Sequence, residues 1–158
     1  MTISATTQGT TRYAQKFACR AAEGHFRDAQ GVIVSSLGIG TYLGALDEKT
    51  DQGYTASTIA AVENGINFID AAINYRFQRS ERNIGAALQE LMTRGFLRDE
   101  LVLCTKAGYL TPDGKMPSDA PCPAIWAILI GPPISFVETR PRTISTIPST
   151  IERVITQL

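Results

Sequence analysis

The sequence predicts a domain of the α/β class whose strands run parallel. Three short apolar runs, centred near Ile39, Phe68 and Leu103, are bounded by glycines or end on a charged residue, as buried strands often are. Their centres lie about 30 and 35 residues apart, which is the length of a strand–helix–strand unit. Helical patterns fill both intervals. This alternation is typical of a parallel α/β fold.

A β-hairpin is expected before the first of these strands. Phe26–Arg27 and Val32–Val34 flank Asp28–Gly31, whose aspartate and glycine favour a turn. The first strand of the parallel set then follows within Ser36–Thr41, the second within Ile66–Asp70 and the third within Leu101–Lys106.

Two helices are expected between the strands. The first follows Asp47–Thr50, has small and apolar residues on one side, and ends at Asn64–Gly65, where glycine permits a left-handed conformation. The second begins at Ser80, which is a good N-cap, and ends at Gly95. Its apolar residues recur at helical spacing: Ile84, Ala87, Leu88, Leu91 and Met92.

Residues 1–24 are expected to form a flexible extension. Thr, Ala and Gln dominate this stretch, and it lacks the apolar segment of a secretory signal. Basic residues recur in it every four positions, at Arg12, Lys16 and Arg20. This spacing leaves a basic amphipathic targeting helix as the alternative.

Composition narrows the classes of partner. The chain has 158 residues, 44% of them apolar, and its 15 basic and 15 acidic side chains cancel, so its charge favours neither nucleic acid nor an anionic membrane surface. The longest apolar run, Ala124–Ile130, is too short to cross a bilayer. The three cysteines are widely spaced, which predicts neither a metal site nor a disulfide framework and favours the cytoplasm.

The α/β pattern stops near residue 120. Six of the eight prolines lie between Pro121 and Pro148, with Ser and Thr in the gaps. We therefore expect residues 25–120 to form the folded domain and residues 121–158 to form a tail. A truncation or a change of reading frame would account for this switch.

Two of the predicted strands end on charged residues that should be neighbours. Asp70 and Lys106 follow strands whose carboxyl ends open onto the same face of a parallel sheet. Tyr75 lies in the loop after Asp70, so its ring can fold over that face. An ammonium beside a phenol favours the phenolate, and a carboxylate holds the ammonium in place. Such a group can protonate a carbonyl oxygen as hydride arrives.

The order of the motifs in this sequence resembles that of a known protein family. Leu37–Thr41, then Gly65–Tyr75, then Ser80–Leu88, then Thr105–Lys106 are similar to the amino-terminal half of the aldo-keto reductases, over about residues 26–108. Such an ordered series is more specific than one short motif. The resemblance implies part of a (β/α)₈ TIM barrel closed at its base by the hairpin. It also implies NADP(H), or alternatively NAD(H), and a small-molecule aldehyde or ketone as substrate.

The resemblance also implies roles for individual residues. Asp70, Tyr75 and Lys106 take the positions of catalytic residues. Gly40, Thr41, Tyr42 and Asp70 take positions that bind the cofactor. The family's catalytic histidine should follow the next strand, but no histidine follows Ala124–Ile130, and the one histidine of the chain is His25. The second interpretation is therefore an inactive remnant that acts as a binding or structural fragment. Three strands cannot close a barrel, so self-association through the open barrel is expected in either case.

Other features have simpler interpretations. Glu81 is expected to favour the positive end of its helix, and His25 is expected at the surface. Cys104 is expected to be a small buried residue. The glycines of residues 38–44 have the wrong spacing for a dinucleotide-binding loop. Three arginines near the second helix are expected on a solvated loop, with phosphate binding as the alternative: Arg76, Arg79 and Arg82.

Overall fold

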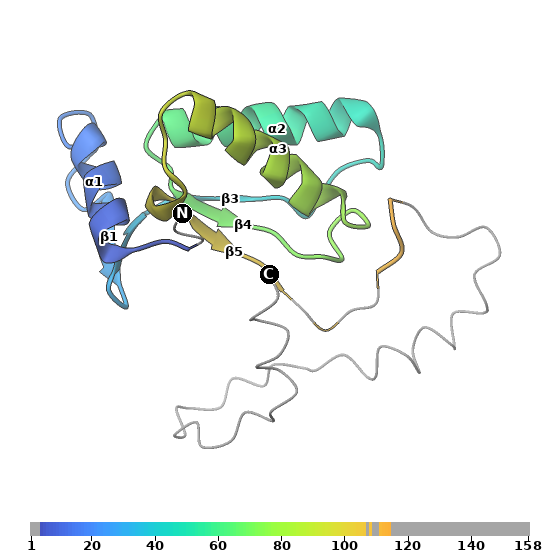
Figure 1. The fold of residues 1–158 in the computed structure, drawn as a ribbon, viewed down its shortest axis with the longest axis horizontal. Coiled ribbons are helices and arrows are strands. Elements are labelled where there is room, and N and C mark those ends of the chain that lie inside the picture. Colours follow the sequence, from blue (N-terminus) through green and yellow to red (C-terminus); the bar gives the residue numbers. More distant parts are fainter. Residues whose placement is uncertain (1–3, 107, 109–110, 115–158) are drawn as a thin grey trace, which may run out of the picture.

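A three-stranded parallel sheet carries the site (Figure 1). The computed structural model describes residues 4–106, 108 and 111–114. Its elements, in chain order, are α1 (Thr7–Phe17), β1 (Phe26–Ala29), β2 (Val32–Ser35), β3 (Gly38–Gly40), α2 (Glu48–Glu63), β4 (Phe68–Asp70), α3 (Arg79–Thr93), a 3₁₀ turn (Arg98–Glu100) and β5 (Val102–Cys104).

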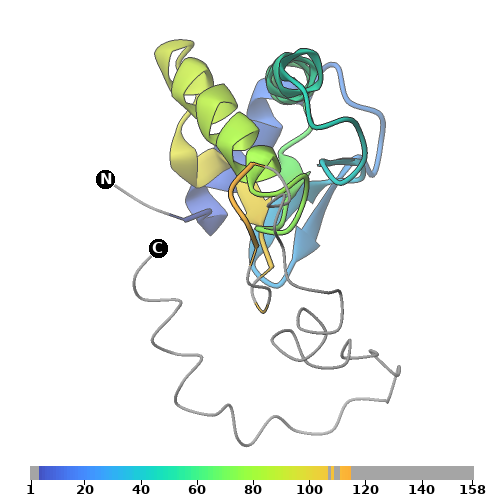
Figure 2. The ribbon, with the colours of Figure 1, turned by 90° about the vertical axis from the view of Figure 1, so that its right-hand side faces the viewer.

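The sheet has the order β3-β4-β5, and both pairs of strands are parallel. Ile39, Ile69 and Leu103 stand in register, as do Gly40, Asp70 and Cys104. Helices α2 and α3 lie together on one face of the sheet (Figures 1 and 2). The predicted strand–helix–strand alternation and the hairpin of β1 and β2 are thus confirmed.

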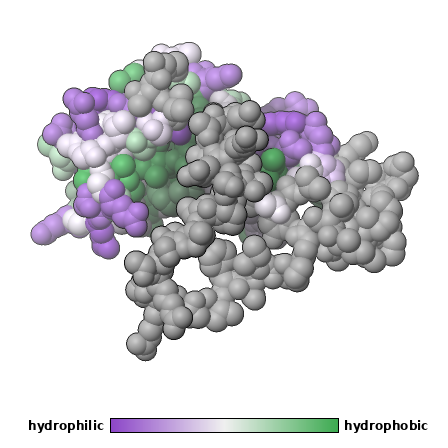
Figure 3. All heavy atoms as spheres, turned by 60° about the horizontal axis from the view of Figure 1, so that its bottom comes forward, coloured by the Kyte–Doolittle hydropathy of each residue, from purple (hydrophilic) through white to green (hydrophobic). Residues whose placement is uncertain are grey.

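The sheet does not close into a barrel within the part of the chain that the structure describes. Its other face carries Phe68 and Asp70, and hydrophobic surface gathers in the middle of the view in Figure 3. An α/β segment that matches part of a barrel fits this arrangement. The predicted self-association through this face stays a prediction.

Local sequence signals explain where the helices begin and end. The Asp47 carboxylate accepts a hydrogen bond of 2.8 Å from the amide of Thr50 and caps α2, and Gly65 follows the helix at a φ of 93°. Helix α3 ends as predicted before Gly95, which has a φ of 88°. Its predicted N-cap is wrong by two positions, because Gln78 in a left-handed conformation is the N-cap and Ser80 lies inside the first turn.

The amino-terminal segment differs from the expected flexible extension, because residues 7–17 form α1. Thr6 caps this helix by accepting a hydrogen bond from the amide of Gly9. The Tyr13 side chain is fully buried, and its hydroxyl donates a hydrogen bond of 2.6 Å to the Val62 carbonyl. Only Tyr13 and Phe17 supply large buried side chains, so the apolar stripe is too narrow to stand out in the sequence.

Two basic residues of α1, Arg12 and Lys16, form ion pairs with the 3₁₀ turn. Arg12 lies 2.7 Å from the carboxylate of Asp99 and 2.9 Å from that of Glu100, and Lys16 lies 2.8 Å from Glu100. Glu100 is completely buried, so these cations compensate the free-energy cost of removing its charged carboxylate from solvent. The ion pairs fix α1 to the turn that precedes β5.

The hydrophobic core lies between α1, the sheet and the two helices. It consists of Tyr13, Phe17, Val62, Ile69, Ala71, Ile84, Leu91 and Leu101. Asn67 is buried beside it and joins the hairpin to the sheet: it accepts a hydrogen bond from the amide of Ser35 and donates one to the carbonyl of Ile33, both 2.9 Å long. The hairpin is therefore attached to the amino-terminal end of β4.

No helix of the described residues is long and apolar enough to span a bilayer. No group of His, Cys, Asp and Glu side chains that could hold a metal ion occurs among those residues either. The predicted tail, residues 121–158, lies outside the described part of the chain.

Candidate active site

The site lies at the carboxyl ends of the three parallel strands. Asp70 is the last residue of β4, and Lys106 follows β5 by two residues. The Lys106 ammonium lies 2.6 Å from Asp70 Oδ1 and donates a second hydrogen bond of 3.1 Å to the carbonyl of Ala71. The two predicted neighbours are therefore in direct contact, because parallel strands bring their carboxyl ends to one edge.

Tyr75 lies over the same edge. Its ring centroid is 4.7 Å from Nζ of Lys106. The Tyr42 ring also packs edge-on against Tyr75, with a centroid distance of 4.9 Å and an angle of 66°. Tyr42 remains 62% exposed, so this aromatic pair forms an accessible rim. The three predicted catalytic residues are thus brought together.

The charge of Lys106 is set by two opposing effects. Partial burial by itself lowers the pKa of Lys106, but hydrogen bonding and electrostatic attraction from Asp70 and Tyr75 outweigh it and raise this pKa above its ordinary value. Lys106 therefore carries its charge at neutral pH. Burial raises the pKa of the Cys104 thiol, and the nearby Asp70 carboxylate adds to this effect, so Cys104, in register with Asp70, stays a neutral thiol.

Thr41 supports the site from within the fold. Its side chain is fully buried, and its hydroxyl donates a hydrogen bond of 2.8 Å to the carbonyl of Asp70. The same hydroxyl contacts the buried hydroxyl of Ser80. This hydroxyl is therefore already engaged, and the predicted contact of Thr41 with a cofactor stays a prediction. The sequence suggested Ser80 as a helix cap and gave no signal for this contact.

The first turn of α3 is bound to two strand ends. Ser80 contacts Thr41 after β3, and the next residue, Glu81, accepts a hydrogen bond from the hydroxyl of Thr105 after β5. Since Thr105 precedes Lys106, this bond also restrains the chain that carries the ammonium. Glu81 thus has a structural partner beyond the helix dipole that the sequence suggested.

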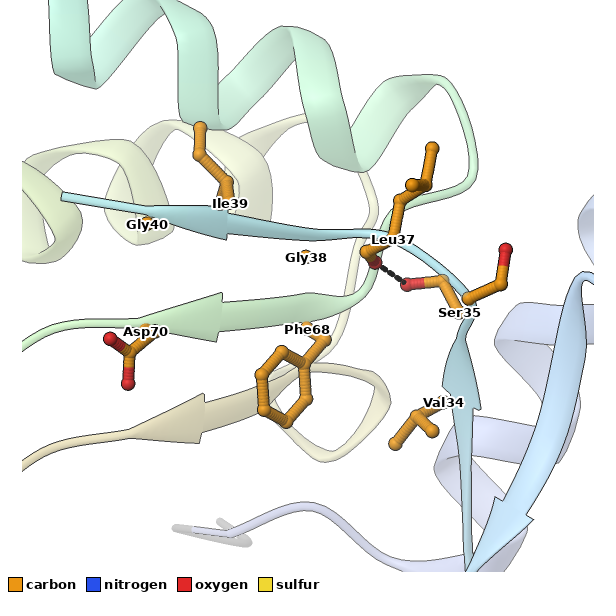
Figure 4. Close-up of a pocket in the computed structure, with 9 residues that line it drawn as sticks. Val34, Ser35, Leu37, Gly38, Ile39, Gly40, Phe68 and Asp70 are labelled. Carbon is orange, nitrogen blue, oxygen red and sulfur yellow. Dashed lines mark hydrogen bonds between the residues drawn. The ribbon is translucent and has the colours of Figure 1, made fainter.

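An open surface adjoins these residues. A cavity of about 400 Å³ extends from Val34 to Gly40 and is also lined by Phe68 and Asp70 (Figure 4). Gly40 is exposed, and a Cβ added there would meet no atom within 4 Å. A flat ring therefore has room against Gly40 beside Asp70.

The remaining candidates lie away from this cluster or are already paired. The His25 ring bonds the Ser36 hydroxyl and the Gly65 carbonyl, each at 3.0 Å, so it joins the hairpin to the loop before β4. The three arginines are engaged by carboxylates: Arg76 and Arg79 by Asp51, and Arg82 by Asp113. The expected solvated loop is wrong for Arg76, which is buried.

Comparison with known proteins agrees with this arrangement. The family model of the aldo/keto reductase family matches residues 36–122, which is more than half of the chain. The aldo-keto reductase YhdN of Bacillus subtilis (strain 168) is 37% identical over 79 residues, which are 48% of this chain and 23% of YhdN. The match thus spans about a quarter of that relative's length. With strands, helices and strand-end residues in the order found here, the chain belongs to the aldo/keto reductase family.

Proposed function

We propose that this chain carries the proton-donating side of an NAD(P)H-dependent carbonyl reductase site. The substrate would be an aldehyde or ketone, and the product an alcohol. The observation that carries the proposal is the contact of Lys106 with both Asp70, at 2.6 Å, and the ring of Tyr75, at 4.7 Å from the centroid. A phenol between solvent and a fixed ammonium is suited to general acid catalysis.

Each residue has a separate role in this proposal. When bound, reduced nicotinamide would supply the hydride that adds to the carbonyl carbon. Tyr75 donates its hydroxyl proton to the carbonyl oxygen and becomes a tyrosinate, which solvent reprotonates afterwards. Lys106 stabilises the negative charge on that tyrosinate, and its raised pKa keeps the ammonium protonated. Asp70 holds the ammonium in place.

The described residues also support a place for the cofactor. Gly40 has no side chain and lies beside Asp70 in the register of the sheet, so a planar ring can approach the backbone there. Tyr42 offers an exposed aromatic face near the same edge. We assign Gly40, Tyr42 and Asp70 to the nicotinamide side, for either NADPH or NADH.

The proposal is tested by segment exchange. The matched 79 residues of this chain, extended to include Lys106 where necessary, replace their counterpart in YhdN, and NADPH oxidation is followed with 4-nitrobenzaldehyde as substrate. Tyr75→Phe in this exchange protein should lower kcat by about 10² to 10⁴-fold, which is the usual contribution of a positioned acid. KM for NADPH should change little, because the phenol contacts the carbonyl oxygen.

Tyr54→Phe is the matched control. Tyr54 donates its hydroxyl to the backbone carbonyl of Leu43 rather than contacting Lys106. Its removal should leave kcat nearly unchanged. A folded exchange protein in which Tyr75→Phe turns over as fast as the unmodified protein would show that Tyr75 is not the acid.

A further inference from the structure

The turn that follows Tyr75 has an uncommon backbone. Arg76, Phe77 and Gln78 have φ angles of 51°, 53° and 69°, so three consecutive residues with side chains occupy the left-handed region. That region is unfavourable for residues other than glycine, and such strain persists only where surrounding contacts enforce it. Contacts strong enough to hold this turn should therefore be found next to Tyr75.

The guanidinium of Arg76 supplies such contacts. The side chain is only 2% exposed, although it is charged. It donates two hydrogen bonds, of 3.0 and 2.7 Å, to the carbonyl of Ala45 and one of 2.6 Å to Asp51. It also lies 5.1 Å from the ring centroid of Tyr54. One buried side chain thus joins the turn to the β3–α2 loop and to α2.

These contacts restrain Tyr75 by two routes. Along the chain, Arg76 is the next residue. Through space, it holds Ala45 in the loop that also carries Tyr42, whose ring packs against Tyr75. Asp51 completes the anchor, because it also binds Arg79 at 2.5 Å and is held by Asn83 at 3.0 Å.

We infer that Arg76 is a positioning residue for Tyr75 and that its buried guanidinium keeps the Tyr75 ring in contact with Tyr42 and Lys106. The role of that phenol in catalysis rests on the proposed function, whereas its restraint by Arg76 does not. A phosphate-binding role is disfavoured, because the guanidinium is buried and already bound to a carboxylate.

The test uses NMR spectra of the full chain with ¹³C-labelled tyrosine. The ring signals are assigned with Tyr75→Phe and Tyr42→Phe, and the nuclear Overhauser effect between the two rings reports their packing. Arg76→Met should abolish most of this effect and move the Tyr75 signals towards those of a free side chain. Arg76→Lys should restore part of the effect, because an ammonium can still bind Ala45 or Asp51.

Two further variants distinguish the effect of the Arg76 guanidinium from that of the left-handed backbone and from that of the other ion pairs of Asp51. Arg76→Gly permits the left-handed turn without strain but lacks the guanidinium, so it should lose the effect as Arg76→Met does. Arg79→Met is the matched control, since Arg79 shares Asp51 but does not bind Ala45, and it should retain the effect. If Arg76→Met loses helical circular dichroism, Asp51→Asn is used instead and should show an intermediate loss.

The inference is overturned if the ring–ring effect survives in Arg76→Met, or if Arg76→Gly keeps it, since the backbone alone would then place Tyr75. An equal loss in Arg79→Met also overturns it. None of these spectra depends on turnover. If Tyr75→Phe retains activity in the exchange protein, the proposed function fails while the restraint of Tyr75 by Arg76 still stands.

Discussion

Among single residues, Thr41 shows how one buried hydroxyl supports the site. It connects the end of β3 to the Asp70 carbonyl and to Ser80. Thr41→Val removes this hydroxyl and leaves the Asp70 carbonyl and the buried Ser80 hydroxyl without this partner, which should lower the free energy of unfolding by about 1–3 kcal/mol. Urea unfolding measures the change, and Thr93→Val, at an exposed site, is the control. Equal stability of the two variants would contradict the role assigned to Thr41.

Asp51 gives the domain a pH dependence in acid. Its burial tends to raise its pKa, but hydrogen bonds from Asn83, Arg76 and Arg79 outweigh burial and lower the pKa below its ordinary value. A lowered pKa adds stability above the unfolded value of about 4, and this stability is lost as the pH falls through the folded value. Asp51→Asn should therefore flatten the fall in Tm below about pH 4.

Thermal unfolding from pH 2 to 6 checks this expectation, with Asp28→Asn on the exposed hairpin as the control. If Asp51→Asn and the unmodified chain show the same fall in Tm, the Asp51 ion pairs do not stabilise the fold.

At the level of the elements, α1 behaves as part of the domain. Tyr13 is buried and bonded to the end of α2. Tyr13→Ala should cost about 3–5 kcal/mol, as large-to-small changes of core aromatic residues do, while Tyr13→Phe should cost about 1 kcal/mol for the lost hydrogen bond. Chemical unfolding measures both. Gln15→Ala, on the exposed side of α1, is the control, and a Tyr13→Ala variant as stable as this control would show that α1 is not docked.

The elements also show which features a sequence can reveal. Strands β3, β4 and β5 were predictable because apolar residues, glycines and terminal charges lie next to one another in the chain. Helix α1 was missed because its stability depends on contacts with Asp99 and Glu100, which lie far away in sequence. The start of α3 was missed because left-handed residues without glycine leave no compositional signal.

In the candidate site, too, the sequence revealed some features and not others. Asp70 and Lys106 could be paired from strand order alone, since the topology of a parallel sheet fixes their proximity. The contacts of Thr41 with Ser80 and of Arg76 with Ala45 could not be predicted. The residues of each pair lie far apart in the sequence, and neither helical nor strand periodicity relates them. Sequence therefore identified the residues of the site, including the Asp70 carboxylate that holds Lys106, but not the supporting contacts of Thr41 and Arg76.

For the molecule as a whole, the site's composition predicts weak activity of this chain alone. Its one histidine, His25, is bound to Ser36 and Gly65, so no imidazole can share the carbonyl oxygen with Tyr75. Hydride transfer also requires a closely positioned nicotinamide. NADPH oxidation with 4-nitrobenzaldehyde, followed at 340 nm, should therefore proceed little faster than without the chain. Robust turnover that Tyr75→Phe abolishes would show that this chain assembles a complete site.

A double-mutant cycle measures whether Tyr75 and Lys106 act together as one acid. kcat is measured for the exchange protein, for Tyr75→Phe, for Lys106→Met and for the double variant. Residues that act as a unit have non-additive effects, so the double variant should be little slower than Tyr75→Phe alone. A double variant whose loss in kcat equals the product of the two single losses would show that Lys106 acts independently of Tyr75.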